Sequence, residues 1–114
     1  MNPDIEKYLE DIKLSIQDIE IYIVDISTSY QYQKDNKTKD AVERRLAIIG
    51  EALNKLNKID NSISITNKTK IIGLRHILVH DYDLINPETI WQIITKHLPL
   101  LKSEVENILN RLEE

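Results

Sequence analysis

The sequence contains no cysteine and only two glycines among its 114 residues. Without cysteine the chain has no disulfide framework, no thiolate zinc site, no iron–sulfur cluster and no thiol nucleophile. Two isolated glycines, Gly50 and Gly73, cannot form a glycine-rich phosphate loop, because such a loop needs several glycines in one short turn. Any catalytic chemistry must therefore come from other side chains, and the lack of cysteine favours a reducing compartment.

Long apolar segments are also missing from the sequence. No segment approaches the roughly 18 to 20 apolar residues of a membrane span, and the chain does not begin with a basic segment followed by an apolar one. We therefore expect a cytoplasmic protein with no membrane partner. The formal net charge of -4 argues against binding polyanions through overall charge, so nucleic-acid binding requires a local basic patch.

What the sequence does contain is a repeated apolar pattern with intervals of three and four residues, which is typical of amphipathic helices. The first stripe runs from Ile5 to Tyr30. Asn2 and Pro3 precede it as a helix cap and a first helical residue. The polar residues 31–37 carry no such stripe, so the pattern predicts one long helix followed by a loop.

Further stripes predict three more helices, with a connector over residues 60–67; the helices span residues 38–59, 67–80 and 87–112. Gly50 lies inside the first of these helices and predicts a close approach by a neighbouring helix. Pro99 lies inside the last helix and predicts a kink. The fold class expected is all-α, an up-down four-helix bundle with long first and last helices, and residues 1–114 form a single domain.

Two of the three histidines and one arginine lie within residues 71–84. On a helix His76 and His80 lie one turn apart, whereas Arg75 and His80 are about 140° apart around the axis. Imidazole can accept and donate a proton near neutral pH, and guanidinium matches the oxygens of a phosphate. These groups could cleave RNA: one removes the proton of a 2'-hydroxyl, whose oxygen attacks phosphorus while arginine stabilises the developing charge.

Other interpretations of this segment remain open. Basic residues near a helix C-terminus interact favourably with the helix dipole and with unpaired carbonyls, which would explain Arg75 and both histidines without any catalysis. His76 and His80 also have the spacing of helical zinc ligands, with Asp81 or Asp83 as a third ligand, but the glutamate that directly follows the first histidine in zinc proteases is absent. We predict no metal and no cofactor.

The spacing Arg75-x4-His80, with the polar His76 after the arginine, resembles the signature of the HEPN superfamily. Tyr82 extends it to Arg-x4-His-x-Tyr, which is similar to the HepT group, the toxin half of HepT/MntA toxin–antitoxin pairs. Further segments resemble this group in order and spacing, so the likeness covers nearly the whole chain; they are residues 8–12, 40–52, 71–75 and 98–102, together with Trp91.

The resemblance implies a homodimer of helical bundles that joins two motifs in one cleft, and a metal-independent ribonuclease whose candidate substrates are tRNA and mRNA. Arg75 and His80 would be the catalytic pair, with His76 as a supporting polar residue. It further implies an MntA-like nucleotidyltransferase antitoxin that binds the chain in a hetero-oligomer and attaches AMP to Tyr82, also a supporting residue. The added AMP would place bulk and negative charge where an RNA phosphate would sit. A Tyr82 that merely packs at the helix end is the plain alternative.

Several charged residues are candidates for supporting roles. Glu51 and Arg44 could line the cleft or hold the catalytic arginine, although a surface salt bridge is an equal alternative for each. A basic rim for RNA could come from Lys37, Lys39, Arg44, Arg45, Lys68 and Lys70, and the net charge predicts that any positive patch is confined to the cleft. Two other functions remain open: a non-catalytic module that is only the partner or substrate of a nucleotidyltransferase, and a structural helical dimer.

Overall fold

A computed structural model describes residues 2–113, apart from the side chain of Tyr82. Its α-helices are α1 (Pro3–Tyr22), α2 (Ser29–Lys34), α3 (Asn36–Ile59), α4 (Lys68–His80), α5 (Pro87–Gln92) and α6 (Leu98–Leu112). A 3-10 turn, η1 (Tyr82–Leu84), follows α4, and a π-helical segment, η2 (Ile93–His97), joins α5 to α6. No strand occurs within residues 2–113, so the predicted all-α fold is confirmed.

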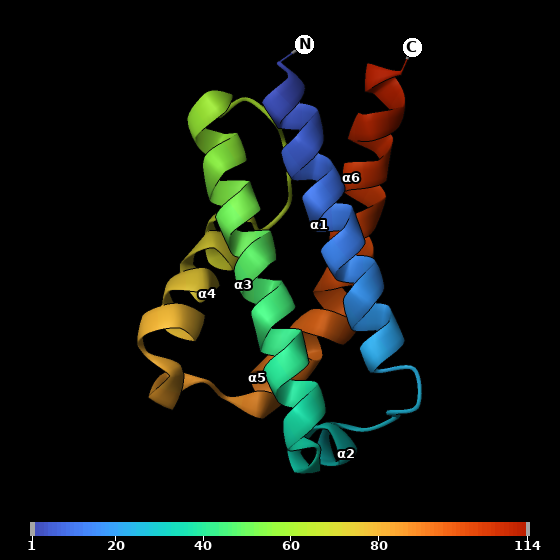
Figure 1. The fold of residues 1–114 in the computed structure, drawn as a ribbon, viewed down its shortest axis with the longest axis vertical. Coiled ribbons are helices and arrows are strands. Elements are labelled where there is room, and N and C mark those ends of the chain that lie inside the picture. Colours follow the sequence, from blue (N-terminus) through green and yellow to red (C-terminus); the bar gives the residue numbers. More distant parts are fainter. Residues whose placement is uncertain (1, 114) are drawn as a thin grey trace.

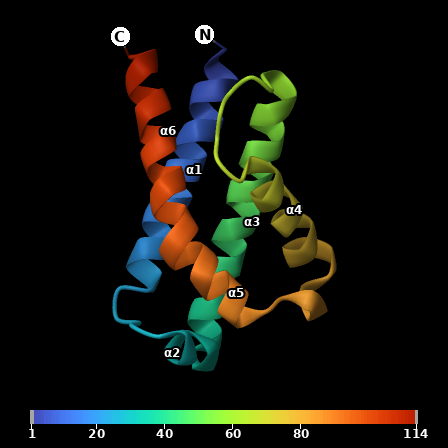
Figure 2. The ribbon, with the colours of Figure 1, turned by 180° about the vertical axis from the view of Figure 1, so that it is seen from behind.

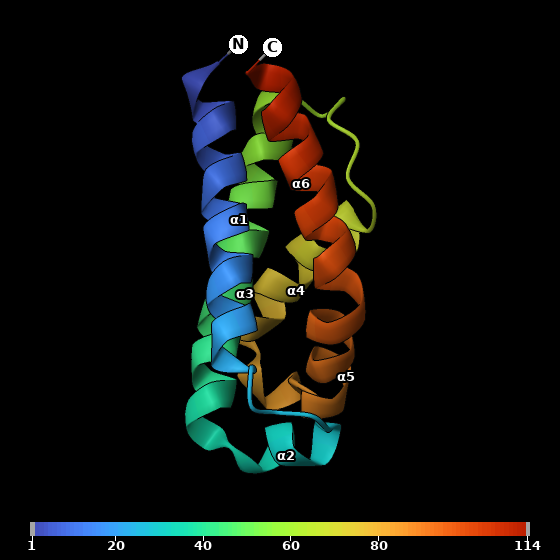
Figure 3. The same cartoon turned by 90° about the vertical axis from the view of Figure 1, so that its right-hand side faces the viewer.

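The long helices alternate in direction and form an up-down bundle (Figure 1). Helix α1 packs against both α3 and α6, and α4 packs chiefly against the outer side of α3. Seen from behind, α4 lies to one side of the bundle with the connector above it (Figure 2). The short α2 closes one end of the bundle, whereas the two termini lie together at the other end (Figure 3).

The apolar stripes predicted from the sequence form the core. The long helices bury one face each, and the largest fully buried side chains are Leu9, Ile12, Ile16, Ile19, Tyr32, Leu46, Ile49, Leu53, Leu56, Ile90, Leu98 and Leu101. Each buried Leu or Ile stabilises the fold by roughly 1.5 to 3 kcal/mol relative to an exposed one. Among the described helices, none combines the length and the apolar character needed to cross a membrane.

The prediction for the first helix was wrong beyond residue 22. Helix α1 ends at Tyr22, and a second short helix, α2, occupies part of the predicted loop. Thr28 starts α2 by accepting a hydrogen bond from the Gln31 backbone at 3.1 Å, and the Gln31 side chain accepts one from the Ser27 backbone at 2.7 Å. These local bonds compete with helix continuation. The apolar stripe continues beyond the end of α1 because Ile23 and Ile26, in the turn after the helix, also pack against the core.

The predicted last helix is divided into α5, η2 and α6, and Pro99 is the second residue of α6. Proline has no backbone N–H, so the carbonyl of Thr95, four residues earlier, loses its α-helical donor. The chain adopts the π-helical η2 directly before this point, and the Thr95 hydroxyl donates a hydrogen bond to the Trp91 carbonyl at 2.7 Å. In the turn before Pro99, where the sequence predicted a kink, the chain forms this π-helical segment.

Gly50 lies where α3 meets α4, as predicted. A Cβ added to Gly50 would lie 2.5 Å from the Arg75 Cβ and 3.0 Å from the Ile71 carbonyl oxygen. Neither neighbour is the flexible end of a side chain, so the two helices would have to separate. Gly73, in contrast, lies on the outer face of α4 with no heavy atom within 4 Å of such a Cβ.

We expect Gly50→Ala to lower the free energy of unfolding by about 1 to 3 kcal/mol, because the added methyl overpacks the α3–α4 contact. The matched control, Gly73→Ala, should raise it by up to about 1 kcal/mol, because alanine favours the helix and meets no neighbour. Urea unfolding of both variants measures the difference. Equal effects of the two substitutions would contradict the close approach at Gly50.

Tyr32 is a fully buried side chain that the sequence placed in a loop. Its ring packs against Trp91 with centroids 5.6 Å apart, and its hydroxyl has no hydrogen-bond partner among the described residues. Burial raises the pKa of Tyr32 far above its ordinary value, and the carboxylates of Glu43 and Asp40 raise this pKa further. The hydroxyl is therefore a polar group that folding removes from water without compensation.

We expect Tyr32→Phe to raise the free energy of unfolding by about 1 kcal/mol, because the unpaired hydroxyl is removed. In the unfolded chain this phenol loses its proton near pH 10, whereas the folded protein retains it, so wild-type stability falls as pH rises above about 10. The variant should show a weaker fall. Denaturant titrations at neutral and alkaline pH test this, with the exposed Tyr30→Phe as the control, and identical alkaline slopes for wild type and Tyr32→Phe would refute it.

Candidate active site

Helix α4 contains Arg75, His76 and His80 of the predicted motif. It begins after Asn67, which adopts a left-handed conformation with φ 60, and it ends at His80. Ile71 is the one residue of α4 that is fully buried; the other apolar side chains of the helix are partly exposed. Helix α4 therefore has an inner face that rests on α3 and an outer face in solvent.

Arg75 lies on the inner face, beside Gly50. Its Nε is 2.6 Å from Oε2 of Glu51, and its side chain is 33% exposed. That carboxylate oxygen is buried and has no aligned hydrogen bond from the described residues, so the contact is an ion pair. Glu51 therefore pairs with Arg75, a contact that fits both the holding role and the surface salt bridge predicted for it.

An open groove of about 410 Å³ runs between α1, α3 and α4 next to this ion pair. We call it the α1–α3–α4 groove; its lining consists of Lys7, Tyr8, Asp11, Arg44, Ala47, Ile48, Glu51, Ala52, Lys55, Arg75 and Val79. Four of these side chains are basic and two are acidic, so a local positive surface occurs on an acidic chain. Of the four basic residues, Arg44 and Arg75 were candidates from the sequence, whereas Lys7 and Lys55 were not.

The basic rim predicted from the sequence is only partly formed at this groove. Arg44 lines the groove. Arg45 instead makes an ion pair with Asp18 at 3.4 Å, and Lys68 donates hydrogen bonds to backbone carbonyls of the connector. These two basic side chains are therefore engaged in structural contacts.

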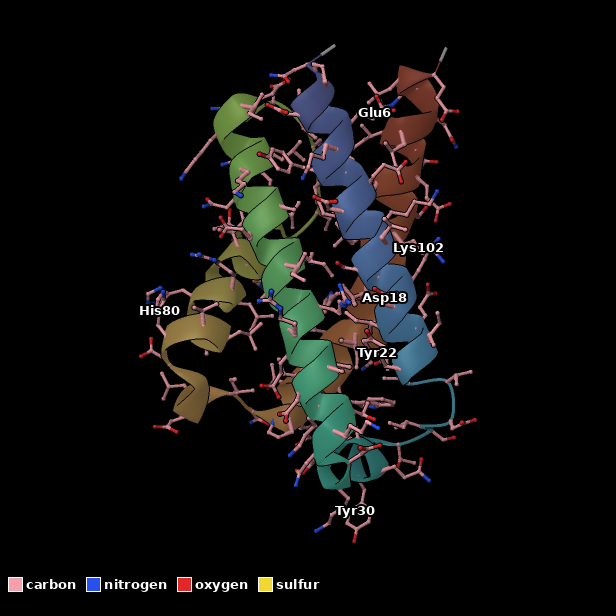
Figure 4. All side chains as sticks on the ribbon, in the orientation of Figure 1. Glu6, Asp18, Tyr22, Tyr30, His80 and Lys102 are labelled. Carbon is pink, nitrogen blue, oxygen red and sulfur yellow. The ribbon has the colours of Figure 1, made fainter. Side chains whose placement is uncertain are left out.

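The two motif histidines lie together on the other side of α4. The rings of His76 and His80 are 4.9 Å apart between centroids, and Nε2 of His76 is 3.5 Å from Oδ2 of Asp81. His80 points away from the bundle (Figure 4). No group of three or more side chains suited to binding a metal ion occurs in the described part of the chain.

Within one chain, Arg75 and His80 do not line the same pocket. Arg75 lines the α1–α3–α4 groove, whereas His76 and His80 do not, as expected from their separation around the helix. The backbone of Tyr82 forms part of η1, which follows α4 directly, but its side chain lies outside the described residues. Trp91 packs on Tyr32 and belongs to the edge of the core.

Tyr8, Lys7 and Lys55 line the groove but were not predicted as site residues. Lys7 and Lys55 lie 5.2 Å and 5.7 Å from the centre of the Tyr8 ring. Lys7 directly precedes Tyr8 in α1, whereas Lys55 comes from α3, so only the contact of Lys55 depends on tertiary packing. The local signals were the adjacent lysine and the position of Tyr8 beside the apolar stripe of α1, next to Leu9.

Known proteins resemble the chain over nearly its whole length. A family model described as Ribonuclease HepT-like matches residues 12–108. Two proteins of Methanocaldococcus jannaschii that are named provisionally as RNases are each 34% identical to it, over 111 and 113 residues; the alignments cover 96% and 97% of this chain and 91% and 96% of those proteins. A Thermococcus cleftensis protein named "Probable ribonuclease HepT" is 30% identical over 102 residues, 89% of this chain and 92% of that protein. No solved structure matches the chain significantly.

Proposed function

The chain belongs to the HepT-like ribonuclease family, and from this premise we propose that it is a toxin that cleaves RNA without a metal ion. The observation that carries the proposal is the Arg75–His80 spacing on a helix whose arginine is held by Glu51 at the rim of a positive groove. The whole chain, residues 1–114, would act as one domain.

The reaction assigned to the motif is an internal transesterification. The 2'-oxygen of a ribose forms a bond to the adjacent phosphorus, and the bond from phosphorus to the 5'-oxygen breaks. One proton leaves the 2'-hydroxyl and one reaches the 5'-oxygen, and the imidazole of His80 can serve in such transfers near neutral pH. The guanidinium of Arg75 would donate hydrogen bonds to the phosphate oxygens as negative charge accumulates.

A homodimer is part of this proposal, because one chain separates the two catalytic groups. The outer face of α4 presents Gly73, His76 and His80, and nothing lies near Gly73 that would prevent a close approach. Leu84, in the turn that follows α4, is 71% exposed to solvent. A second copy on the outer face of α4 would join the motifs of two subunits in one cleft.

Regulation by an antitoxin follows the same resemblance. An MntA-like nucleotidyltransferase would join the Tyr82 oxygen to the α-phosphorus of ATP, with release of pyrophosphate and loss of the phenol proton. Tyr82 lies two residues after His80, so the attached AMP would place a negative charge and bulk beside the motif. RNA would then be excluded by repulsion and by steric overlap.

We expect purified wild-type protein to cleave RNA in the presence of EDTA, and His80→Ala to reduce the rate about 10²- to 10⁴-fold through loss of proton transfer. Arg75→Ala should reduce it about 10²- to 10³-fold through loss of charge stabilisation. His97→Ala, which changes the one histidine outside the motif, is the matched control and should retain activity. Gel assays of single-turnover cleavage measure these rates.

Full cleavage by both motif variants would remove this mechanism. If the wild type cleaves no RNA and yet Tyr82 accepts AMP, the non-catalytic partner of a nucleotidyltransferase becomes the better assignment.

We expect Tyr82→Phe to keep its ribonuclease activity and to escape neutralisation, because the phenol oxygen that would accept AMP is gone. Incubation with the nucleotidyltransferase and ATP should leave the mass of this variant unchanged, and co-expression should fail to relieve growth arrest. Tyr30→Phe, at an exposed tyrosine, should gain AMP and be neutralised like the wild type. Modification of Tyr82→Phe would assign the AMP to another residue.

A further inference from the structure

Tyr8 combines an aromatic face with an unusual concentration of positive charge. Its ring lines the α1–α3–α4 groove, with the ammonium groups of Lys7 and Lys55 at 5.2 Å and 5.7 Å from the ring centre. Arg44 and Arg75 line the same groove. One stacking surface and four cations are thus accessible from one opening.

We propose that the α1–α3–α4 groove is a binding subsite for a nucleotide of the RNA strand, in which a base stacks on Tyr8 while Lys7, Lys55 and Arg44 contact phosphates. This inference rests on the proposed function, because Arg75 of the motif lies in the same groove and would connect the bound nucleotide to the cleavage site. The volume of the α1–α3–α4 groove, about 410 Å³, lies within the range of small-ligand sites.

The charges in the groove leave cations available for phosphate. Both acidic side chains already have basic partners: Asp11 pairs with Lys7 at 3.1 Å, and Glu51 pairs with Arg75 at 2.6 Å. The contact between Lys55 and Glu51 is long, at 4.0 Å, and half of the Lys55 side chain is exposed. Arg44 is exposed as well. An incoming phosphate would therefore meet two exposed cations, Lys55 and Arg44, whose charge is weakly compensated.

The aromatic face favours RNA over an acidic peptide as the occupant. Carboxylates of a peptide could pair with the same lysines, but they would make no use of the Tyr8 ring. A base can replace one ammonium over the ring by stacking, and the released lysine can then contact the adjoining phosphate. Aromatic stacking flanked by cations is the usual recognition of single-stranded nucleic acid without sequence preference.

A second tyrosine–lysine pair on this chain provides a matched control. The Lys34 ammonium lies 5.3 Å from the centre of the Tyr30 ring, much as Lys7 does at Tyr8. Tyr30, however, is 69% exposed, does not line the groove, and lies in α2 at one end of the bundle (Figure 4). If a cation over an exposed ring were sufficient for RNA binding, Tyr30 would contribute as much as Tyr8.

The test uses full-length protein and a fluorescent single-stranded 2'-O-methyl RNA, which lacks the attacking hydroxyl and stays intact. We expect Tyr8→Ala to raise the dissociation constant about tenfold, and Tyr8→Phe and Tyr30→Ala to change it less than about twofold. Lys55→Glu should weaken binding more than Lys58→Glu, which makes the same charge change on the same helix at a residue outside the groove lining. Thermal melting establishes that each variant is folded.

Three results would overturn the subsite. The first is unchanged RNA affinity of both Tyr8→Ala and Lys55→Glu in a protein that still cleaves RNA, which leaves the proposed function intact. The second is unchanged RNA affinity together with lost binding of the nucleotidyltransferase, which makes the groove a protein-docking surface. The third is an absence of both RNA binding and cleavage in the wild type, which removes the proposed function as well. Should Tyr8→Ala fail to fold, the Lys55→Glu and Lys58→Glu pair decides the matter.

Discussion

The close approach of α3 and α4 at Gly50 is the constraint on which the candidate site depends. Because Gly50 has no Cβ, the backbone of α4 can lie against α3, with the Arg75 Cβ in the space that a side chain would fill. The next residue, Glu51, then holds the guanidinium at 2.6 Å. Two adjacent residues of α3 thus perform separate tasks, since one provides the space and the other fixes the charge.

The packing of α4 against α3 also determines which motif side chains face solvent. Once Arg75 faces α3, the geometry of a helix turns His76 and His80 toward the opposite side. Ile71 is the one buried residue of α4, and Gly73, His76 and His80 remain exposed on its outer face. In the proposed homodimer, a site assembled from two copies would use both faces of this helix.

Local pattern was sufficient to predict much of the bundle, and tertiary packing explains the rest. The stripes of α1, α3 and α6 and the connector followed from residue spacing, because helices bury every third or fourth side chain. The close approach at Gly50 followed from the cost of a glycine inside a helix. The end of α1 was missed because Ile23 and Ile26 continue the spacing through a turn. Tyr32 and Tyr8 were missed for another reason. Trp91, which packs on Tyr32, and Lys55, which lies over the Tyr8 ring, come from helices distant in sequence.

The net charge of -4 and an RNA substrate are compatible if attraction acts only at short range. At physiological ionic strength, charges separated by more than about 8 Å are largely screened, so an approaching phosphate responds to the groove lining and not to the whole chain. There, the acids are paired with Lys7 and Arg75, while Arg44 and Lys55 remain exposed. An acidic exterior then disfavours indiscriminate binding elsewhere on the surface.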